Sequence, residues 1–563
     1  MAIQKYVKLG VYELAAMAII VFGTLLRVVL VGLQWPLFNS DEGTMGIMAL
    51  HIASRGDHPL FYYGQHFMGT LDAYLAAGVF RVLGSSILTL RGSMLLLYVP
   101  FLLVMYGLTR LLYSKQMALG CLLILSLGSI PILNLEVRPL VYADILVLGA
   151  CAFLLACGLV LSASPQPGQP GRGWRVLGYG CWGVVAGLGV WSDPLVLPYV
   201  AAAGLLLLVW CWRELVFQMG GLCLLLGWLV GAAPLLLYNL SAPAGQDSLS
   251  IVLAQAHPVT SGPGQFTPLS RHLINTILYN IPTATGDPFC NLVFSQGPIH
   301  MPGLRCTIVH ASWSLGLMVL WLVAVVLALR GLWTGQQGVG GQPSAAEHSH
   351  SMRRESARLL LLGSAGLTVL VFTLSAPSIP SSAGNARYLH CLLISVPAVL
   401  CPLWRGASKL TAAGGLRASS RVVVSRALLL LVAIVCVAGT LAALQDVPAV
   451  RLIEQQRQAM ILQLERRHIR HFYTDDYWTC YRMAFASGEA ITCAVIGADL
   501  RPSGSNRNRY GPYVGQVQAD RHAAYVLPLA DAHTPWIVRN AHLASRHYLR
   551  LDLPGYVIYT KRL

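Results

Sequence analysis

The sequence predicts an α-helical polytopic membrane protein that carries a small α/β domain at its C-terminal end. Hydrophobic residues make up 55% of the 563 residues, and charged residues only 11%. Apolar runs long enough to cross a hydrocarbon core of about 30 Å recur between residues 11 and 444. The chain beyond residue 444 is polar and rich in His, Arg and Tyr, which indicates a soluble domain.

Eleven segments have the length and hydropathy that a transmembrane helix requires. They lie at about residues 11–33, 88–109, 116–134, 139–162, 174–191, 193–212, 217–238, 312–330, 358–374, 387–404 and 426–444. The first is too long for the apolar core of a signal peptide and lacks an Ala-x-Ala cleavage site, so we expect a retained span. Two shorter segments, 43–55 and 69–84, are interrupted by His51, Asp72 and Arg81, and we expect helices along the outer surface.

The distribution of charge predicts a multi-pass protein of the plasma (inner) membrane with a cytoplasmic N-terminus. In that orientation the cytoplasmic segments hold sixteen basic and four acidic residues, whereas the opposite face and the spans before residue 445 hold eight basic and nine acidic residues. This bias follows the positive-inside rule. Most of the net charge of +16 therefore faces anionic lipid headgroups, and we expect no nucleic-acid partner.

The chain is expected to form a membrane domain followed by a soluble domain. Because the number of spans is odd and the N-terminus is cytoplasmic, the soluble domain is expected outside the cytoplasm. We expect residues 1–444 to form the first, with outer loops at 34–87 and 239–311, and residues 445–563 to form the second. Counting only one of the two short surface segments as a span would invert everything after it. The secondary structure expected in the second domain is a helix at 450–470 and strands near 523–529 and 556–559.

Cysteine placement agrees with this topology. Nine of the thirteen cysteines lie in predicted spans, where Cys usually serves as a small apolar packing residue. The other four fall in outward segments as two pairs, Cys290 with Cys306 and Cys480 with Cys493, and an oxidising compartment would permit a disulfide in each. No Cys and His spacing matches a structural zinc site.

The candidate catalytic residues are two adjacent carboxylates, Asp41 and Glu42, just beyond the first span. Adjacent like charges repel, so a wet cavity, a cation or a hydroxyl proton nearby would explain the pair. A solvated loop start is the commoner explanation for such a pair on its own. Residues 57–72 follow and are dense in aromatic and hydrogen-bonding groups, as sugar-binding surfaces are. The candidate acceptor-binding or supporting residues there are Tyr62, Tyr63, Gln65 and Asp72.

Further ionisable residues fall at the outer ends of later spans. They are Glu136, Arg138, Asp144, Asp193 and Arg387, which precedes Tyr388. Snorkelling explains single charges of this kind, and we expect it for Arg27 in the first span, with helix capping for Asp193. The gathering of all these charges on one side is harder to explain in this way.

Several features together resemble the GT-C superfamily of integral membrane glycosyltransferases. They are Asp41 and Glu42 after span one, the surface helices, Arg138 and Asp144 near span four, the Arg387-Tyr388 entry to span ten and the outward C-terminal domain. Within the superfamily the chain is most similar to glycosyltransferase family 39, which includes protein O-mannosyltransferases and the bacterial aminoarabinose transferases of lipid A. Residues 62–73 (YYGQHFMGTLDA) and 473–482 (YTDDYWTCYR) resemble segments of bacterial members.

The resemblance implies transfer of a single sugar from a polyprenyl-phosphate carrier to a lipid, glycan or protein acceptor on the outer face. Asp41 would accept the acceptor's hydroxyl proton and give inversion. Arg387, and after it Arg138, would bind the leaving phosphate. The supporting roles are less defined: Glu42 positions the acceptor or holds Arg138, Asp144 orients the same arginine, and Glu136, Tyr62, Tyr63, Gln65, Asp72 and Tyr388 support the site or bind the acceptor.

Some alternatives remain open at the level of sequence. Asp475, Asp476, Trp478 and Tyr481 contact an acceptor sugar or form the aromatic core of the small domain. We expect no cofactor; a divalent metal is conceivable because relatives that transfer oligosaccharides use one, but two arginines would replace its charge. The alternative functions are a lipid-linked-sugar transporter or flippase, for which charges near mid-membrane would be expected, and a GT-C scaffold without activity.

Overall fold

The computed structural model describes residues 10–162, 172–243, 245–256, 268–286, 303–337, 345–379, 383–408, 416–497, 499–528 and 548–561. The chain divides into two compact units. The first, here called the helical unit, consists of Met1–Arg27, Leu97–Glu136 and Tyr142–Leu444. The second, here called the α/β unit, consists of Val28–Leu96, Val137–Val141 and Gln445–Leu563.

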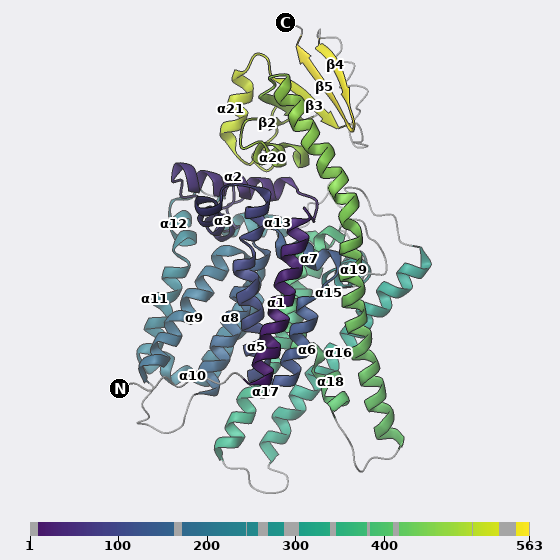
Figure 1. Cartoon of the computed structure of the whole chain (residues 1–563). Coiled ribbons are helices and arrows are strands. Elements are labelled where there is room, and N and C mark those ends of the chain that lie inside the picture. The colour runs from purple at the N-terminus through teal and green to yellow at the C-terminus, as the bar shows by residue number, and fades with distance from the viewer. Residues whose placement is uncertain are drawn as a thin grey trace, which may run out of the picture. The chain divides into compact units, whose positions relative to one another are not determined.

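The helical unit is a bundle of long apolar helices (Figure 1). Its helices, some of which run past its limits, are α1 (Val11–Gly32), α5 (Leu95–Leu112), α6 (Lys115–Ser126), α7 (Ile130–Val137), α8 (Tyr142–Leu161), α9 (Arg172–Ser192), α10 (Leu197–Phe217), α11 (Met219–Gly231), α12 (Ala233–Ser241), α13 (Ser248–Ala256), α14 (Leu269–Asn275), α15 (Ile281–Thr285), α16 (Leu304–Gln337), α17 (Ala345–Leu374), α18 (Val396–Ser408) and α19 (Leu416–Arg466). Short segments join them: η1 (Pro194–Val196), η3 (Ala376–Ser378) and η4 (Ala383–Ser395) are 3₁₀-helical, and η2 (Thr276–Asn280) is π-helical.

Fewer than the eleven expected segments meet the length and hydropathy that a membrane span requires. Within the described ranges, eight helical stretches are long and apolar enough to cross a membrane. The pairs α6–α7 and α11–α12 are bent by 86° and 65°, and they raise the number to ten if each pair is one span. The expected span that falls short is α9, whose many glycines lower its hydropathy.

Those glycines have a packing role against α11. A Cβ added at Gly183 would lie 2.2 Å from the backbone oxygen of Leu224, and one at Gly231 would lie 2.3 Å from that of Val184. The two helices therefore touch backbone to backbone. In a bilayer, where burial of apolar surface drives association only weakly, such close approach supplies van der Waals contact between helices.

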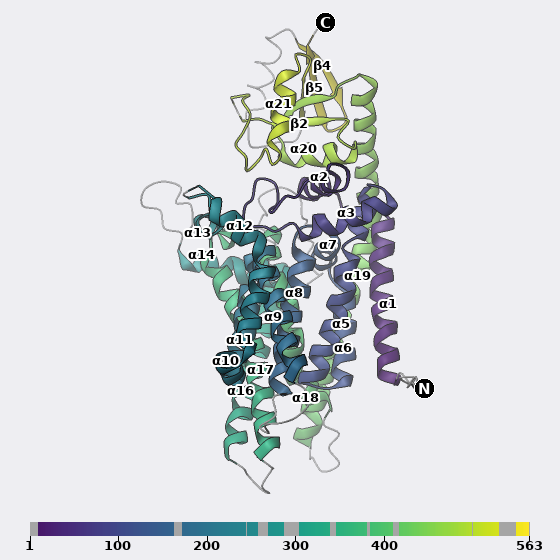
Figure 2. The same cartoon turned by 90° about the vertical axis from the view of Figure 1, so that its left-hand side faces the viewer.

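The α/β unit combines surface helices with a five-stranded sheet (Figure 2). Its helices are α2 (Ser40–Arg55), α3 (Leu71–Leu83), α4 (Ile87–Gly92), α20 (Tyr477–Ala486) and α21 (Gly511–Ala519), and its strands are β1 (His471–Thr474), β2 (Thr492–Val495), β3 (Ala524–Pro528), β4 (Tyr548–Leu553) and β5 (Tyr556–Lys561). The strand order is β2-β1-β3-β5-β4, with β1 parallel to β2 and β3, and β5 antiparallel to β3 and β4. The two strands expected near 523–529 and 556–559 are thereby confirmed as β3 and β5.

Apolar side chains and one disulfide hold this sheet to α20. Phe472, Val526 and Ile558 are fully buried on neighbouring strands. The expected disulfide between Cys480 and Cys493 is present and joins α20 to β2. The other expected pair includes Cys290, which lies outside the described residues.

The helix expected at 450–470 is the end of α19, which continues without interruption from residue 416 to residue 466. The last predicted span and the start of the small domain are therefore one helix. One limit between the two compact units falls at residue 444, where the division was expected, and residues 28–96 and 137–141 also group with the C-terminal segment.

Candidate active site

The acidic pair begins a helix rather than a loop. Asn39 is the N-cap of α2: its side chain accepts the backbone N–H of Glu42 at 2.9 Å, and the Glu42 carboxylate accepts the N–H of Asn39 at 3.3 Å. This reciprocal capping box fixes the first turn. Asp41 and Glu42 thus lie where the positive end of the helix dipole stabilises carboxylates.

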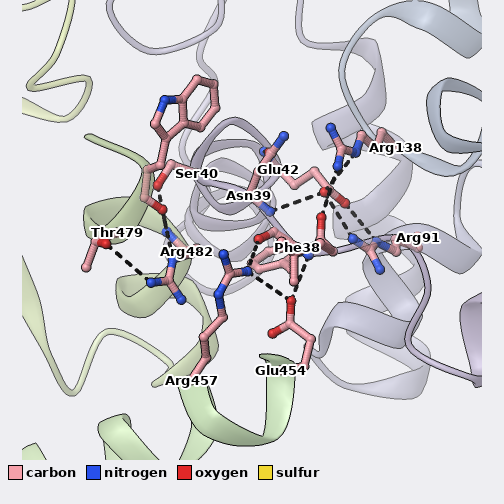
Figure 3. A network of polar contacts seen from close by, with 12 residues as sticks. Phe38, Asn39, Ser40, Glu42, Arg91, Arg138, Glu454, Arg457, Thr479 and Arg482 are labelled. Carbon is pink, nitrogen blue, oxygen red and sulfur yellow. Dashed lines mark hydrogen bonds and ion pairs between the residues drawn. The ribbon is translucent and has the colours of Figure 1, made fainter. Parts of the chain in front are cut away.

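Glu42 is fully buried, and both of its oxygens are occupied. Arg91 donates from Nε to Oε2 at 2.7 Å and from Nη2 to Oε1 at 3.0 Å, and Nε of Arg138 lies 3.2 Å from Oε1. Figure 3 shows Glu42 between these two guanidinium groups. Arg138 also donates to the backbone oxygen of Leu37 at 2.9 Å. One carboxylate therefore pairs with two cations, the buried Arg91 and the partly exposed Arg138, which makes Glu42 the centre of an ion-pair cluster.

Arg91 was not expected to take part in the site. It lies in α4, inside the apolar run at 88–109, and its side chain is only 1% exposed. An arginine inside an apolar run is a signal in itself, because such a charge is costly unless it is paired. The sequence therefore contained the clue to Arg91, although not to its partner.

The chain before α2 is held by the last turns of α19. Phe38 donates its N–H to Oε1 of Glu454, and Nη1 of Arg457 donates to the Phe38 backbone oxygen, both at 2.8 Å. Figure 3 shows this second pair of charged residues below Phe38. The entry to α2 is thus fixed on both sides of its backbone.

Asp41 has surroundings different from those of Glu42. It is 8% exposed, and its Oδ1 accepts the hydroxyl of Tyr477 on α20 at 2.6 Å. Its backbone oxygen accepts the Tyr62 hydroxyl at 3.2 Å. Within the described part of the chain, Oδ2 of Asp41 has no hydrogen-bond partner. The site thus presents one carboxylate oxygen that can accept a proton.

A close contact between α2 and α20 brings Tyr477 to Asp41. A Cβ added at Gly43 would lie 2.4 Å from the backbone oxygen of Tyr481, so no larger residue fits between the two helices. Asp476 caps α20 by accepting the N–H of Trp478 at 2.9 Å. Tyr481 is fully buried, and burial raises its pKa to about 12.

Arg509 lies beside the same carboxylate. Its guanidinium is 5.5 Å from the ring centre of Tyr62 and 5.4 Å from that of Tyr477, so it forms a cation–π contact with both rings. In the amide orientation that matches donors to acceptors, the side-chain oxygen of Gln65 accepts from Nη1 and Nη2 of Arg509 at 3.0 and 3.1 Å. Burial, followed by the charge of Asp41, raises the pKa of Tyr477, which therefore stays protonated at neutral pH.

Tyr63 belongs to a neighbouring cluster. Its hydroxyl lies 2.9 Å from Nδ1 of His51, and its ring stacks on Tyr510 at 5.0 Å. Nε2 of His51 lies 2.9 Å from Oε1 of Glu489, which also accepts the Tyr513 hydroxyl at 2.7 Å. This cluster joins α2 to the segment between α20 and α21 and contains none of the contacts of Asp41.

Asp72, at the start of α3, is fully buried and holds a short segment of chain. Its Oδ2 accepts the N–H of Val141 at 2.7 Å. Val141 has φ 51°, an unfavourable conformation for a β-branched residue. Burial raises the pKa of Asp72 to about 7. The geometry suits a residue that positions the segment with Arg138 better than one that contacts an acceptor.

The remaining candidates lie in the helical unit. Glu136 pairs with Arg27, and both side chains are buried. Snorkelling of Arg27 was therefore a wrong expectation, because its partner lies inside the bundle. Asp144 accepts the Ser192 hydroxyl and the N–H of Ile145, the latter at 2.7 Å.

Arg387, on η4, was expected to bind the leaving phosphate. Its Nη2 donates to the hydroxyl of Tyr388 at 3.2 Å, and its guanidinium lies 5.1 Å from that ring. Arg387 also interacts electrostatically with Asp193. Asp193 caps η1 by accepting the N–H of Leu195 at 2.9 Å, so the expected capping role is confirmed.

The helical unit also contains a cavity of about 430 Å³, a volume within the usual range for ligand sites. Its lining is almost wholly apolar and includes Leu273, Trp313, Trp321 and Val399. Glu136 is the one acidic residue of this lining. In the described segments, no group of three or more His, Cys, Asp and Glu side chains could hold a metal ion.

Comparisons with known proteins identify the fold. No protein-family model and no curated protein matches the sequence. The structure is similar to the crystal structure of ArnT from Cupriavidus metallidurans bound to undecaprenyl phosphate, with a TM-score of 0.56, 12% sequence identity and 97% of each chain covered. The apo state of the same protein gives a TM-score of 0.54 at the same identity and coverage. The chain therefore has the GT-C fold that the sequence predicted, with several membrane spans and a small C-terminal sheet.

Proposed function

We propose that this protein is an inverting glycosyltransferase that moves one sugar, a hexose or a pentose, from a polyprenyl-phosphate carrier to an acceptor hydroxyl. The observation that carries the proposal is the hydrogen bonding of Asp41 on a GT-C fold: the Tyr477 phenol holds one carboxylate oxygen, and the other oxygen is unpartnered among the described residues. A general base needs such an oxygen. Glu42 offers none, because two arginines occupy both of its oxygens.

The proposed reaction is a single displacement. The acceptor hydroxyl gives its proton to Oδ2 of Asp41 while its oxygen attacks the anomeric carbon. The bond from that carbon to the phosphate oxygen breaks, and its electron pair leaves with the polyprenyl phosphate. Attack opposite the phosphate inverts the anomeric centre. A carboxylate is a weak base, so the proton moves late, when the new bond is largely formed.

Two features of the helical unit support a lipid-linked donor. The apolar cavity suits an isoprenoid chain in polarity. Arg387 is the proposed phosphate ligand, because a guanidinium matches phosphate oxygens in a bidentate manner. Arg138 is the weaker candidate, since Glu42 and the Leu37 carbonyl already occupy it. The ArnT structure, which has the same fold, is bound to undecaprenyl phosphate.

The test is incubation of the purified protein with polyprenyl-phosphate mannose or polyprenyl-phosphate aminoarabinose and a panel of lipid and peptide acceptors. We expect consumption of one donor and transfer of its sugar with inverted configuration. The Asp41→Asn variant provides the background rate. Absence of turnover with every donor would contradict the proposal and favour a transporter or an inactive scaffold.

The charge bias supports a location in the plasma (inner) membrane with the α/β unit outside the cytoplasm. In intact cells, a membrane-impermeant thiol reagent should label an Asn506→Cys variant but not a Gly340→Cys variant, with the unmodified chain as the background. Labelling in the reverse order would place Asp41 on the cytoplasmic side and remove the outward site.

A further inference from the structure

We propose that Tyr477 and Arg509 are positioning residues that fix the carboxylate of Asp41 and leave Oδ2 as its reacting oxygen. The inference rests on the proposed function, which names Asp41 as the base but not what orients it. It assigns a role to two residues of the C-terminal segment that the sequence did not single out. These residues lie 436 and 468 positions after Asp41 in the chain.

The hydrogen bond between Tyr477 and Asp41 is short, and the Tyr477 hydroxyl is its donor. At 2.6 Å it has the length of a hydroxyl bonded to an ionised carboxylate, which is stronger than a bond between neutral groups. The phenol stays protonated at neutral pH, because burial and the charge of Asp41 disfavour its anion. Oδ1 is therefore occupied by a constant donor, and rotation of the carboxylate is restrained.

Arg509 supports this donor from the other side. Its Nε lies 3.4 Å from the Tyr477 oxygen, so the phenol accepts from Arg509 while it donates to Asp41. Bonds arranged in such a chain polarise one another. Gln65 fixes the plane of the guanidinium, and Tyr62 covers its face while donating to the Asp41 backbone. The cation thus acts on Asp41 through a neutral phenol, and the carboxylate has no direct ion pair with any described residue.

This arrangement reconciles two requirements of a carboxylate base. The carboxylate must be ionised before the reaction, and one of its oxygens must remain able to take a proton. A direct arginine pair, as at Glu42, would meet the first requirement but occupy the oxygens. The titratable and charged groups that face Asp41 from other segments are Tyr62, Tyr477 and Arg509.

The kinetic test compares Tyr477 with Tyr513, another tyrosine of the α/β unit whose hydroxyl donates to a carboxylate. Tyr477→Phe should lower kcat by about ten- to a hundredfold while the donor KM changes less than about twofold, because orientation and charge stabilisation of the base are lost but donor binding is not. The acid limb of its pH–rate profile should move to higher pH, since the lost donor favoured the ionised form. Tyr513→Phe removes the bond to Glu489 and should leave both quantities unchanged.

Arg509 provides a second variant in case Tyr477→Phe folds poorly. Arg509→Gln should move the acid limb in the same direction, and Arg509→Lys should restore part of kcat, because it keeps the charge but loses the planar fork. The inference would be overturned if Tyr477→Phe and Tyr513→Phe had the same kcat and donor KM. It would also be overturned if the acid limb of the pH–rate profile stayed in place in both the Tyr477 and the Arg509 variants.

A thermal-unfolding cycle separates the inference from the proposed function. The single variants Asp41→Ala and Tyr477→Phe and the double variant should be non-additive in Tm, because either change removes the same bond. Additive shifts would show that the two residues are not coupled and would overturn the positioning role. Coupling without donor turnover in the unmodified protein would instead contradict the glycosyltransferase proposal.

Discussion

The α/β unit and the helical unit each contain a carboxylate with one oxygen that has no hydrogen-bond partner in the described structure. In the α/β unit one such carboxylate is Asp41, which is 8% exposed and bonded to a neutral phenol. In the helical unit one is Glu136, which is 1% exposed and pairs directly with the buried cation of Arg27. An oxygen without a partner therefore suggests a base only where no cation pairs directly with the carboxylate. On this criterion we expect a structural role for Glu136, and Asp41 remains the proposed base.

The largest expected effect belongs to Asp41. Asp41→Asn keeps the size of the side chain and an acceptor for Tyr477 but removes the basic oxygen. We expect folded protein, near-normal donor binding and a loss of turnover on the order of a hundredfold or more. Turnover should be measured in monodisperse detergent-solubilised protein that still binds donor.

Glu42→Gln is the matched control for that change. It removes the ionised partner of the buried Arg91, so it should cost about 3–5 kcal/mol of stability rather than act on the chemistry. If Glu42→Gln is folded and inactive while Asp41→Asn is active, the base is the other carboxylate. If both variants stay active, neither carboxylate is the base.

The second effect tests the structural role of the pair in the helical unit. Arg27→Met or Glu136→Gln should each lower stability by about 3–5 kcal/mol, because one charge remains buried without its partner. The double variant Arg27→Met with Glu136→Met should recover most of this loss. The measurement is the Tm of each variant in detergent solution. A Glu136→Gln protein that folds normally but has no turnover would contradict a purely structural role for Glu136.

The third effect concerns the glycine contact between α9 and α11. A Cβ at Gly187 would meet the backbone oxygen of Trp228 at 2.5 Å and the nitrogen of Ala232 at 2.6 Å. Gly187→Ala should therefore destabilise the protein by about 1–3 kcal/mol through overpacking. Gly158→Ala on α8 is the control, because its Cβ would have no neighbour within 4 Å. Equal Tm values for the two variants would show that α9 and α11 are not in backbone contact.

The smallest effect is a pH dependence from Asp72. Burial raises its pKa to about 7 from an ordinary value of 3.8. Between these values the folded protein keeps a proton that the unfolded chain has released, so stability falls as the pH rises through this window. Asp72→Asn keeps an acceptor for the N–H of Val141. The Tm of this variant should change less with pH between the two pKa values than the Tm of the parent protein. Asp552→Asn, whose side chain is 63% exposed in the parent chain, should leave the profile unchanged.

The sequence predicted those features that depend on neighbouring residues. Apolar runs located the membrane helices, alternation located β3 and β5, and the outward cysteines predicted the bond between Cys480 and Cys493. The acidic pair was noticed because two adjacent charges after an apolar run are unusual. In each case the signal lies within a few residues of the structure that it predicts.

Features that depend on distant residues were missed. Tyr477 and Arg509 meet Asp41 through tertiary packing, and nothing near residue 41 indicates them. Glu136, the partner of Arg27, lies 109 residues away in the sequence. Without a visible partner, snorkelling was the explanation that the sequence offered for Arg27. The contact of α9 with α11 was readable in part, since Gly183 and Gly187 have the four-residue spacing that favours close helix packing.

The α/β unit is assembled from three separate stretches of chain, and this has a consequence for biosynthesis. Helix α2 is synthesised more than four hundred residues before α20, which packs against it. The face of α2 that meets α20, at Gly43 and Gly46, stays uncovered by α20 throughout that interval. A nascent chain that stops before Tyr477 cannot complete this packing, and quality-control proteases would find an exposed helix near its beginning. Packing of the helix that carries Asp41 therefore waits until α20 has been synthesised.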